Sequence, residues 1–213
     1  MSFKLGQTVL VILMAVTVVL SNILVHFVVG EWLTYAAFTY PFAFLITDLA
    51  NRLYGPRLAR MIVYVGFATG IAGSLIGTQV IGEFGPLVTL RVAIASGTAF
   101  LVSQLLDVKL FLVFFSSEKW WRAPLISSFI GGALDTLIFF SLAFHSAFVF
   151  IEPSNDVAWA NVAEPFLGFG PSTAFWVSLA AADFLVKLGV VGLSLIPFRL
   201  VLGKMRVQEE IKT

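Results

Sequence analysis

Six long apolar stretches separate short polar segments along the chain. They cover about residues 5–29, 32–48, 61–82, 91–115, 123–147 and 173–197. An α-helix rises 1.5 Å per residue, so about 20 apolar residues cross a hydrocarbon layer roughly 30 Å thick. The stretch at 32–48 is shorter than the others and contains Pro41. It therefore qualifies only as a short, thinned or partly re-entrant span, whereas the other five qualify by length alone.

The composition agrees with this pattern and excludes an ordinary soluble domain. Hydrophobic residues make up 59% of the 213 residues and charged residues 12%, with a mean hydropathy of +0.98. Soluble domains have about 45–50% apolar and about 25% charged residues, so this chain has too few polar side chains to cover a water-facing surface. We expect an all-α, polytopic membrane protein in which residues 1–213 form a single domain with six transmembrane helices.

The first stretch has one alternative interpretation, because Lys4 precedes it as a basic residue precedes the core of a signal peptide. Its apolar region is much longer than the roughly 7–15 residues of such a core, and no small-x-small cleavage site follows it. We therefore expect residues 5–29 to be retained as a helix.

Basic residues indicate how the chain is oriented, because positively charged loops stay in the cytoplasm. Such residues gather before the first stretch, between the second and third, between the fourth and fifth, and after the sixth: Lys4, Arg52, Arg57, Arg60, Lys119, Arg122, Arg199, Lys204, Arg206 and Lys212. The alternate loops carry mainly acidic residues, with Arg91 as the exception. This distribution predicts that both termini are cytoplasmic.

Polar and ionisable side chains inside the stretches are the candidates for function. A charge costs at least about 2.5–3.5 kcal/mol at the bilayer centre, so these residues should face the protein interior or a cavity. The candidates are Asp48, Asn51, Gln104, Asp107, Asp135, Asp183 and Lys187. Helical rise places Asp135 and Asp183 near the membrane midplane and the others nearer the cytoplasmic side. We expect the polar faces of three helices to converge.

Several of these candidates have a purely structural alternative. Asp183 and Lys187 are spaced i, i+4 and could simply neutralise each other. Asp107 is close enough to the inner boundary to be a solvated helix end. Asp135 has no partner nearby in the sequence, so a binding role is favoured most strongly for this residue.

The neutral polar residues are more ambiguous. Gln104 could be an interhelical hydrogen-bonding residue. Asn22 and His26 share one face of the first stretch, and packing there is as reasonable as ligand contact.

Four glycines in the third stretch lie on one helical face at positions 66, 70, 73 and 77. Small residues at this spacing allow two membrane helices to approach closely. The stripe is expected to serve static packing, although a sliding interface or a homodimer would use the same feature.

Enzyme motifs are absent from the sequence. It contains no H-E-x-x-H, Walker loop or G-x-S-x-G, its two histidines are isolated, and it has no cysteine. We therefore expect no catalytic residues, no metal site and no cofactor. The net charge of +1 also gives no electrostatic reason to expect nucleic-acid binding. The residues alone predict a transporter or channel with a central polar site in a lipid bilayer.

The chain resembles the queuosine precursor transporter family, also known as vitamin uptake transporter-like. The resemblance extends over nearly all six stretches. It is carried by Ser21-Asn22-Ile23-Leu24, Thr39-Tyr40-Pro41, Phe44-Leu45-Ile46-Thr47-Asp48-Leu49-Ala50-Asn51, Tyr54-Gly55, Arg91 with Ala95-Ser96, Phe100-Leu101-Val102-Ser103-Gln104-Leu105-Leu106-Asp107 and Gly132-Ala133-Leu134-Asp135-Thr136 before Ile138-Phe139. Arg52 departs from the pattern, because many members carry an acid at that place.

The resemblance implies an importer of the inner (plasma) membrane that salvages 7-cyano-7-deazaguanine or 7-aminomethyl-7-deazaguanine for tRNA queuosine. Asp135 would accept the adjacent N–H donors of the guanine-like edge, as one carboxylate can do bidentately. Gln104 and Asn51 would donate to the ring carbonyl, and Tyr40 or Phe139 would stack on the base. Asp48, Asp107 and Asn22 complete the expected substrate-binding set, while Asp183 and Lys187 form an ion pair or take part in coupling.

Energy coupling is left open by the sequence. Asp135 or Asp107 could carry a proton, or transport could be facilitated diffusion. A chain of this size also suits the substrate-binding subunit of an ATPase-driven vitamin importer. The Ala-x-x-x-Ala pair that often marks such subunits is missing, because Ala15 is followed by Val19. A channel or structural membrane protein is the third alternative.

Overall fold

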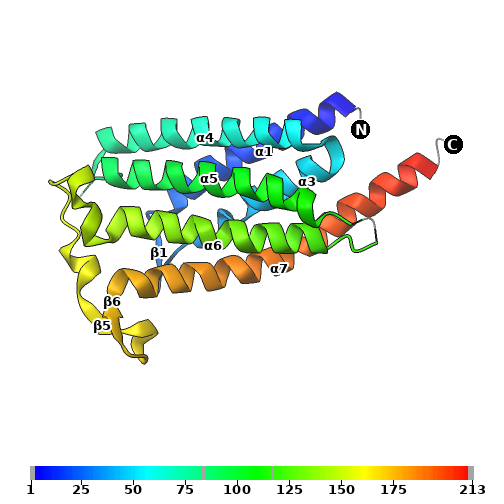
Figure 1. The fold of residues 1–213 in the computed structure, drawn as a ribbon. Coiled ribbons are helices and arrows are strands. Elements are labelled where there is room, and N and C mark those ends of the chain that lie inside the picture. The colour runs from blue at the N-terminus through cyan, green and yellow to red at the C-terminus, as the bar shows by residue number, and fades with distance from the viewer. Residues whose placement is uncertain (1–2, 83–84, 117, 211–213) are drawn as a thin grey trace.

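A bundle of long helices lying side by side forms the protein (Figure 1). The computed structural model describes residues 3–82, 85–116 and 118–210. Seven α-helices are found in this part of the chain: α1 (Phe3–Leu24), α2 (Ala36–Thr39), α3 (Phe42–Tyr54), α4 (Pro56–Gln79), α5 (Leu90–Phe114), α6 (Arg122–Phe144) and α7 (Phe175–Glu210). Five of them, α1, α4, α5, α6 and α7, are long and apolar enough to cross a membrane. The polytopic, mainly helical class is therefore confirmed.

Short strands and 3-10 helices connect the long helices at one end of the bundle. Three antiparallel pairs are found in the described residues, namely β1 (Val28–Val29) with β2 (Leu33–Thr34), β3 (Ile81–Gly82) with β4 (Gly85–Pro86), and β5 (Ala163–Pro165) with β6 (Ser172–Ala174). The connection between α6 and α7 also contains η1 (Ser146–Ile151), η2 (Ala158–Asn161) and η3 (Phe166–Gly168). The strands are too short to alter the helical class.

The second predicted span is not one continuous helix. Residues 32–34 belong to the β1–β2 hairpin, and Pro41 separates the four-residue α2 from the 13-residue α3. Proline has no N–H to donate to the preceding turn, which explains the break. At about 20 Å, α3 is too short to cross alone, although it continues beyond residue 48 to Tyr54. Positive φ at Gly55 (86°) then turns the chain directly into α4.

The predicted boundaries of the other stretches need smaller corrections. The first helix ends at Leu24 and not at residue 29, because the following residues form a turn and β1. The third predicted stretch starts five residues too late, since α4 begins at Pro56, where proline is well suited to the first turn of a helix. The start of α1 and the end of α7 lie at the same end of the bundle (Figure 1).

The glycine stripe of α4 packs inside this single chain. A Cβ atom at Gly66 would lie 2.7 Å from Phe100 of α5 and 2.9 Å from Met14 of α1, and one at Gly73 would lie 2.8 Å from the Asn22 amide. The Asn22 amide also donates to the carbonyl of Gly70 over 3.5 Å. The expected static packing is therefore found between α4 and its two neighbours.

The distribution of polar and apolar side chains is the reverse of that in a soluble protein. Large apolar side chains are exposed around the bundle, including Ile76, Leu137 and Leu193, whose exposed fractions exceed 60%. Lys187 and several carboxylates are instead buried inside it. A lipid environment favours this arrangement, because the apolar outside faces hydrocarbon and the charges pair internally.

Candidate binding cavity

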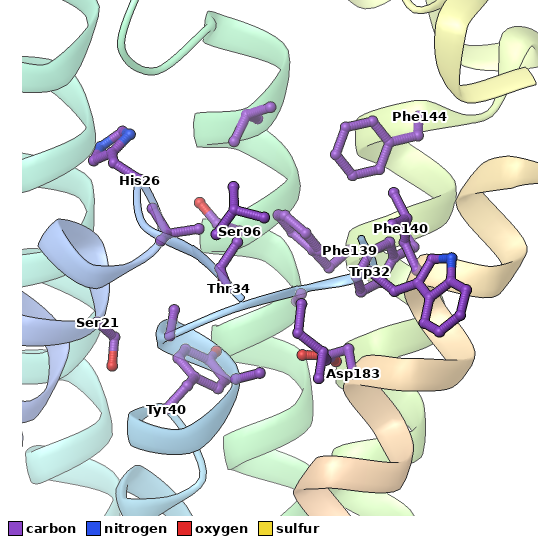
Figure 2. Close-up of a pocket in the computed structure, with 18 of the residues that line it drawn as sticks. Ser21, His26, Trp32, Thr34, Tyr40, Ser96, Phe139, Phe140, Phe144 and Asp183 are labelled. Carbon is purple, nitrogen blue, oxygen red and sulfur yellow. The ribbon is translucent and has the colours of Figure 1, made fainter. Parts of the chain in front are cut away.

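A cavity of about 470 Å³ lies among α1, α2, α5, α6, α7 and the β1–β2 hairpin. Its wall includes a group of aromatic residues, namely Trp32, Tyr40, Phe139, Phe140, Phe144 and Trp159. Figure 2 shows Phe139, Phe140 and Phe144 along one side, with Tyr40 and Asp183 at the lower end of the view. Of the sequence-predicted site residues, six line this cavity: Asn22, Tyr40, Asp135, Phe139, Asp183 and Lys187.

One ammonium group joins two carboxylates in the cavity wall. Lys187 Nζ lies 2.6 Å from Asp183 Oδ2 and 2.8 Å from Asp135 Oδ2. The predicted i, i+4 pair on α7 is therefore present, but it is shared with a third charge on α6. With both aspartates ionised, the cluster carries one negative charge in excess.

Asp135 obtains its partners from α5, from α7 and from the break between α2 and α3. Its Oδ1 atom accepts hydrogen bonds from the Tyr40 hydroxyl at 3.1 Å and from Ser103 of α5 at 3.3 Å. Lys187 donates to its Oδ2 atom. The side chain of Asp135 is only 4% exposed, whereas that of Asp183 is 15% exposed. Asp183 is thus the carboxylate nearer the surface of the cavity.

Hydrogen bonds from neighbouring groups fix the rest of this cluster. The Thr136 hydroxyl donates to Asp183 Oδ2 at 2.9 Å and lies 3.0 Å from Lys187 Nζ. The break between α2 and α3 brings Tyr40 into the bundle, where Lys187 Nζ lies 5.4 Å from the centre of its ring. This distance is typical of a cation–π contact.

Phe139, one of the two predicted stacking residues, belongs to an aromatic group on α6. Its ring meets that of Phe140 edge to face at 5.1 Å and that of Phe144 at 6.0 Å. Trp159 of η2 extends the group, 5.5 Å from Phe144. Flat apolar surfaces therefore cover the side of the cavity next to the charged cluster.

The four remaining predicted residues, Asp48, Asn51, Gln104 and Asp107, do not line the cavity. They are buried between α3, α5 and α6, at exposures of 0–5%. Thr47 donates to Gln104 Oε1 at 2.7 Å, and the Asn51 amide donates to the carbonyl of Val108 at 2.9 Å. The structure thus divides the predicted site into a cavity group and a deeper buried group.

Arg91 is a structural anchor at the strand end of the bundle. Its side chain is fully buried, and it donates to the carbonyl groups of Leu142 at 2.7 Å and His145 at 2.6 Å. Its backbone N–H donates to Glu152 at 2.8 Å. These bonds tie the start of α5 to the end of α6, and Arg91 does not line the cavity.

Sequence reasoning missed Trp32, Phe140, Phe144, Trp159 and Thr136 as residues of the site. In an apolar stretch an inward-facing aromatic residue looks the same as a lipid-facing one, so no signal marked Trp32, Phe140 or Phe144. Trp159 lies in the connection between the fifth and sixth stretches, where no contact with the bundle was predicted. Thr136 directly follows Asp135 and lies in a segment that carries the family resemblance, and this could have singled it out.

A multi-pass helical membrane protein with an aromatic cavity and a buried charge cluster has the features of a small-molecule transporter. Over residues 34–202 the chain matches the family described as "Putative vitamin uptake transporter". The chain therefore belongs to this family, the one that its motifs resemble. Because the family consists of transporters, an enzymatic activity is not expected.

Two relatives make the comparison more specific. The queuosine precursor transporter of Escherichia coli (strain K12) is 38% identical over 138 residues, covering 58% of this chain and 62% of that protein. The probable queuosine precursor transporter of Haemophilus influenzae (strain ATCC 51907 / DSM 11121 / KW20 / Rd) is 32% identical over 166 residues, covering 73% of this chain and 62% of that protein. The chain thus matches somewhat less than two thirds of each relative's length. No solved structure matches it.

Proposed function

We propose that this protein imports 7-deazaguanine precursors of queuosine across the inner (plasma) membrane. The names of the two relatives support this substrate class. The observation that carries the proposal is the charged cluster of Asp135, Lys187 and Asp183 in the wall of an aromatic cavity. The six-span arrangement, with both termini in the cytoplasm, is part of the same proposal.

The cavity suits a small, flat heterocycle. Its volume of about 470 Å³ lies within the roughly 300–1,000 Å³ of small-molecule sites. Tyr40 and Phe139 both line it, so a base bound there could stack on either ring. A bound base would thus lie between the aromatic side and the charged cluster.

The negative charge of the cluster suits the donor groups of the substrate. A guanine-like edge presents a ring N–H beside an exocyclic amine, and a carboxylate can accept both. Asp183 is the more exposed of the two carboxylates in the cavity wall, and Asp135 is more deeply buried. Both pair with the ammonium group of Lys187. The excess charge would also attract the ammonium group of the aminomethyl precursor.

The position of the amides changes the proposed contacts. Asn22 lines the cavity and remains a substrate-binding candidate. Gln104 and Asn51 lie outside the cavity wall, so direct contact with the ring carbonyl is no longer proposed for them in this conformation. Asp48 and Asp107 also lie outside the cavity wall, so neither is proposed to contact the substrate.

The test is precursor salvage in a bacterium that cannot make queuosine and lacks its own importer. Queuosine in tRNA is measured with 7-cyano-7-deazaguanine or its aminomethyl relative supplied at low concentration. We expect restoration by the intact chain. Loss of one charge-assisted hydrogen bond costs about 1.5–3 kcal/mol, so Asp135→Asn and Asp183→Asn should each need roughly ten- to a hundredfold more precursor.

Glu118→Gln is the matched control, because it removes an exposed carboxylate by the same change. It should salvage like the intact chain at equal membrane abundance. Normal salvage and base preference in both aspartate variants would contradict the proposed site. No salvage by an intact chain present in the membrane would contradict the substrate, and co-purification with an ATPase would support the alternative of a substrate-binding subunit.

A further inference from the structure

Two carboxyl groups that do not line the cavity lie together in a deeper layer of the bundle. Asp48 of α3 is 2% exposed and Asp107 of α5 is fully buried. Asp48 lies at the centre of α3, and Asp107 lies in the second half of α5, which runs toward the end of the bundle where α1 starts and α7 ends (Figure 1). The layer therefore lies between the cavity and that end.

The hydrogen-bond donors around the two carboxyl groups are unevenly distributed. Ser127 donates to Asp48 Oδ1 at 3.3 Å, and Ser128 donates to Asp48 Oδ2 at 3.1 Å. The same two hydroxyl groups also lie near Asp107, but each has a single proton and can donate to only one carboxyl group at a time. With both serines donating to Asp48, neither oxygen of Asp107 has a donor among the described residues.

The two carboxyl groups are also in direct contact. They lie close enough to hydrogen bond with each other if one of them is protonated. As two carboxylates they would both be acceptors, and they would repel each other in a buried site. Two buried carboxyl groups in contact commonly resolve this conflict by sharing one proton.

No described cation neutralises this pair. Lys187, on the cavity side, forms salt bridges with Asp135 and Asp183 and not with this pair. Around the layer, the guanidinium groups of Arg52 on α3 and Arg199 on α7 lie over the rings of Phe115 and Trp120. Four further basic side chains on the neighbouring helices are exposed: Arg57 and Arg60 on α4, Lys109 on α5 and Arg122 on α6.

A single proton on Asp107 would give both carboxyl groups a hydrogen-bond partner. Its O–H would donate to Asp48, which would remain a carboxylate with three donors. An unpartnered carboxylate at this buried position would cost several kcal/mol, and protonation of Asp107 would avoid this cost. The proton needs no additional space, in contrast to a metal ion with five or six oxygen ligands.

We propose that Asp48 and Asp107 share one transferable proton and form the proton-coupling site of the transporter. This inference rests on the proposed import function. The proton would enter from outside and leave to the cytoplasm in each cycle, with only the O–H bond of Asp107 formed and broken. The site would thus bind a proton and not the 7-deazaguanine.

The two sites are connected through the helices they share. Ser103, which donates to Asp135 in the cavity wall, lies one helical turn before Asp107 on α5. Thr47, next to Asp48 on α3, donates to Gln104, next to Ser103 on α5. A shift between α3 and α5 would therefore change the cavity wall and the carboxyl pair together.

The experiment uses the full chain in vesicles loaded with buffer, with the membrane potential set to zero. Uptake of 7-cyano-7-deazaguanine is measured with and without an acidic exterior. With one proton per substrate, a difference of one pH unit should drive accumulation toward about tenfold. Asp107→Asn can still donate to Asp48 but has no transferable proton, so its uptake should not respond to the pH gradient.

Glu118→Gln is the control and should respond to the gradient like the intact chain. Gradient-driven accumulation in Asp107→Asn, or accumulation by the intact chain driven by Na⁺ and not by pH, would overturn the proposal. If the intact chain takes up no precursor with or without the gradient, this result contradicts the proposed import function and not the proton site specifically.

Infrared spectroscopy tests the shared proton without any substrate. The carbonyl stretch of a protonated carboxylic acid is distinct from that of a carboxylate. We expect this band in the intact chain at neutral pH and its loss in Asp107→Asn but not in Glu118→Gln. Absence of the band from the intact chain would overturn the shared proton whatever the transport result.

Discussion

Lys187 is the residue that makes a buried carboxylate pair tolerable in the cavity wall. It is 5% exposed and lies within 2.8 Å of both Asp135 and Asp183. Removing one partner of a buried ion pair leaves a charge without compensation in a medium that solvates it poorly. Replacing Lys187 by a neutral residue would leave two such charges, those of Asp135 and Asp183.

Replacement of Lys187 should therefore destabilise the fold strongly. We expect Lys187→Met, which keeps most of the side-chain volume, to lower the free energy of unfolding by about 3–5 kcal/mol. Adding Asp183→Asn to this variant should restore part of the loss, because one of the two uncompensated charges is removed. The measurement is the Tm of the detergent-solubilised protein, followed by tryptophan fluorescence. An unchanged Tm in Lys187→Met would contradict the role of the ammonium group.

The sequence predicted this cluster only as far as its contacts are local. The Asp183–Lys187 pair follows from helical spacing, since both residues lie on α7. Asp135 is 52 residues away from Lys187 and 95 from Tyr40, so its partners depend on how helices assemble. The cost of burial indicated that Asp135 needed partners but not which residues would supply them.

At the scale of elements, α4 shows how a sequence stripe becomes a packing surface. Gly66, Gly70 and Gly73 lie against side chains of α1, and a Cβ atom at Gly66 or Gly73 would be too close to its neighbours. The sequence predicted close approach but not the partner helix, because spacing alone does not distinguish packing inside the chain from a homodimer. The α2–α3 break was less predictable, since a short apolar run with a proline fits several backbone paths.

Two matched glycine substitutions test the packing of α4. Gly66→Val should destabilise the bundle by about 1–3 kcal/mol, because its side chain would enter the space of Phe100 and Met14. Gly192→Val makes the same change on α7 at an exposed position with no atom within 4 Å of the new Cβ. Its Tm should stay close to that of the intact chain. Equal Tm values for the two variants would contradict the packing argument.

At the scale of the whole molecule, the α2–α3 segment determines the number of membrane crossings. Five helices are long enough to span, and five crossings would place the termini on opposite sides. The start of α1 and the end of α7 nevertheless lie at the same end of the bundle (Figure 1). The broken α2–α3 segment returns the chain to that end, so it acts as a sixth crossing in the proposed arrangement. The asymmetry of basic residues independently favours an even number of crossings.

Single cysteines on either side of the segment test this sixth crossing directly, since the chain contains no cysteine of its own. Glu31 lies between β1 and β2, Arg57 lies at the start of α4, and both are exposed. We expect Glu31→Cys to react with a membrane-impermeant thiol reagent in intact cells, and Arg57→Cys to react only after permeabilisation. Asp156→Cys and Glu118→Cys, on opposite sides of α6, are the controls. Labelling of both Glu31→Cys and Arg57→Cys from outside would mean that α2–α3 is re-entrant, and the Asp48–Asp107 pair would then need a different route to the cytoplasm.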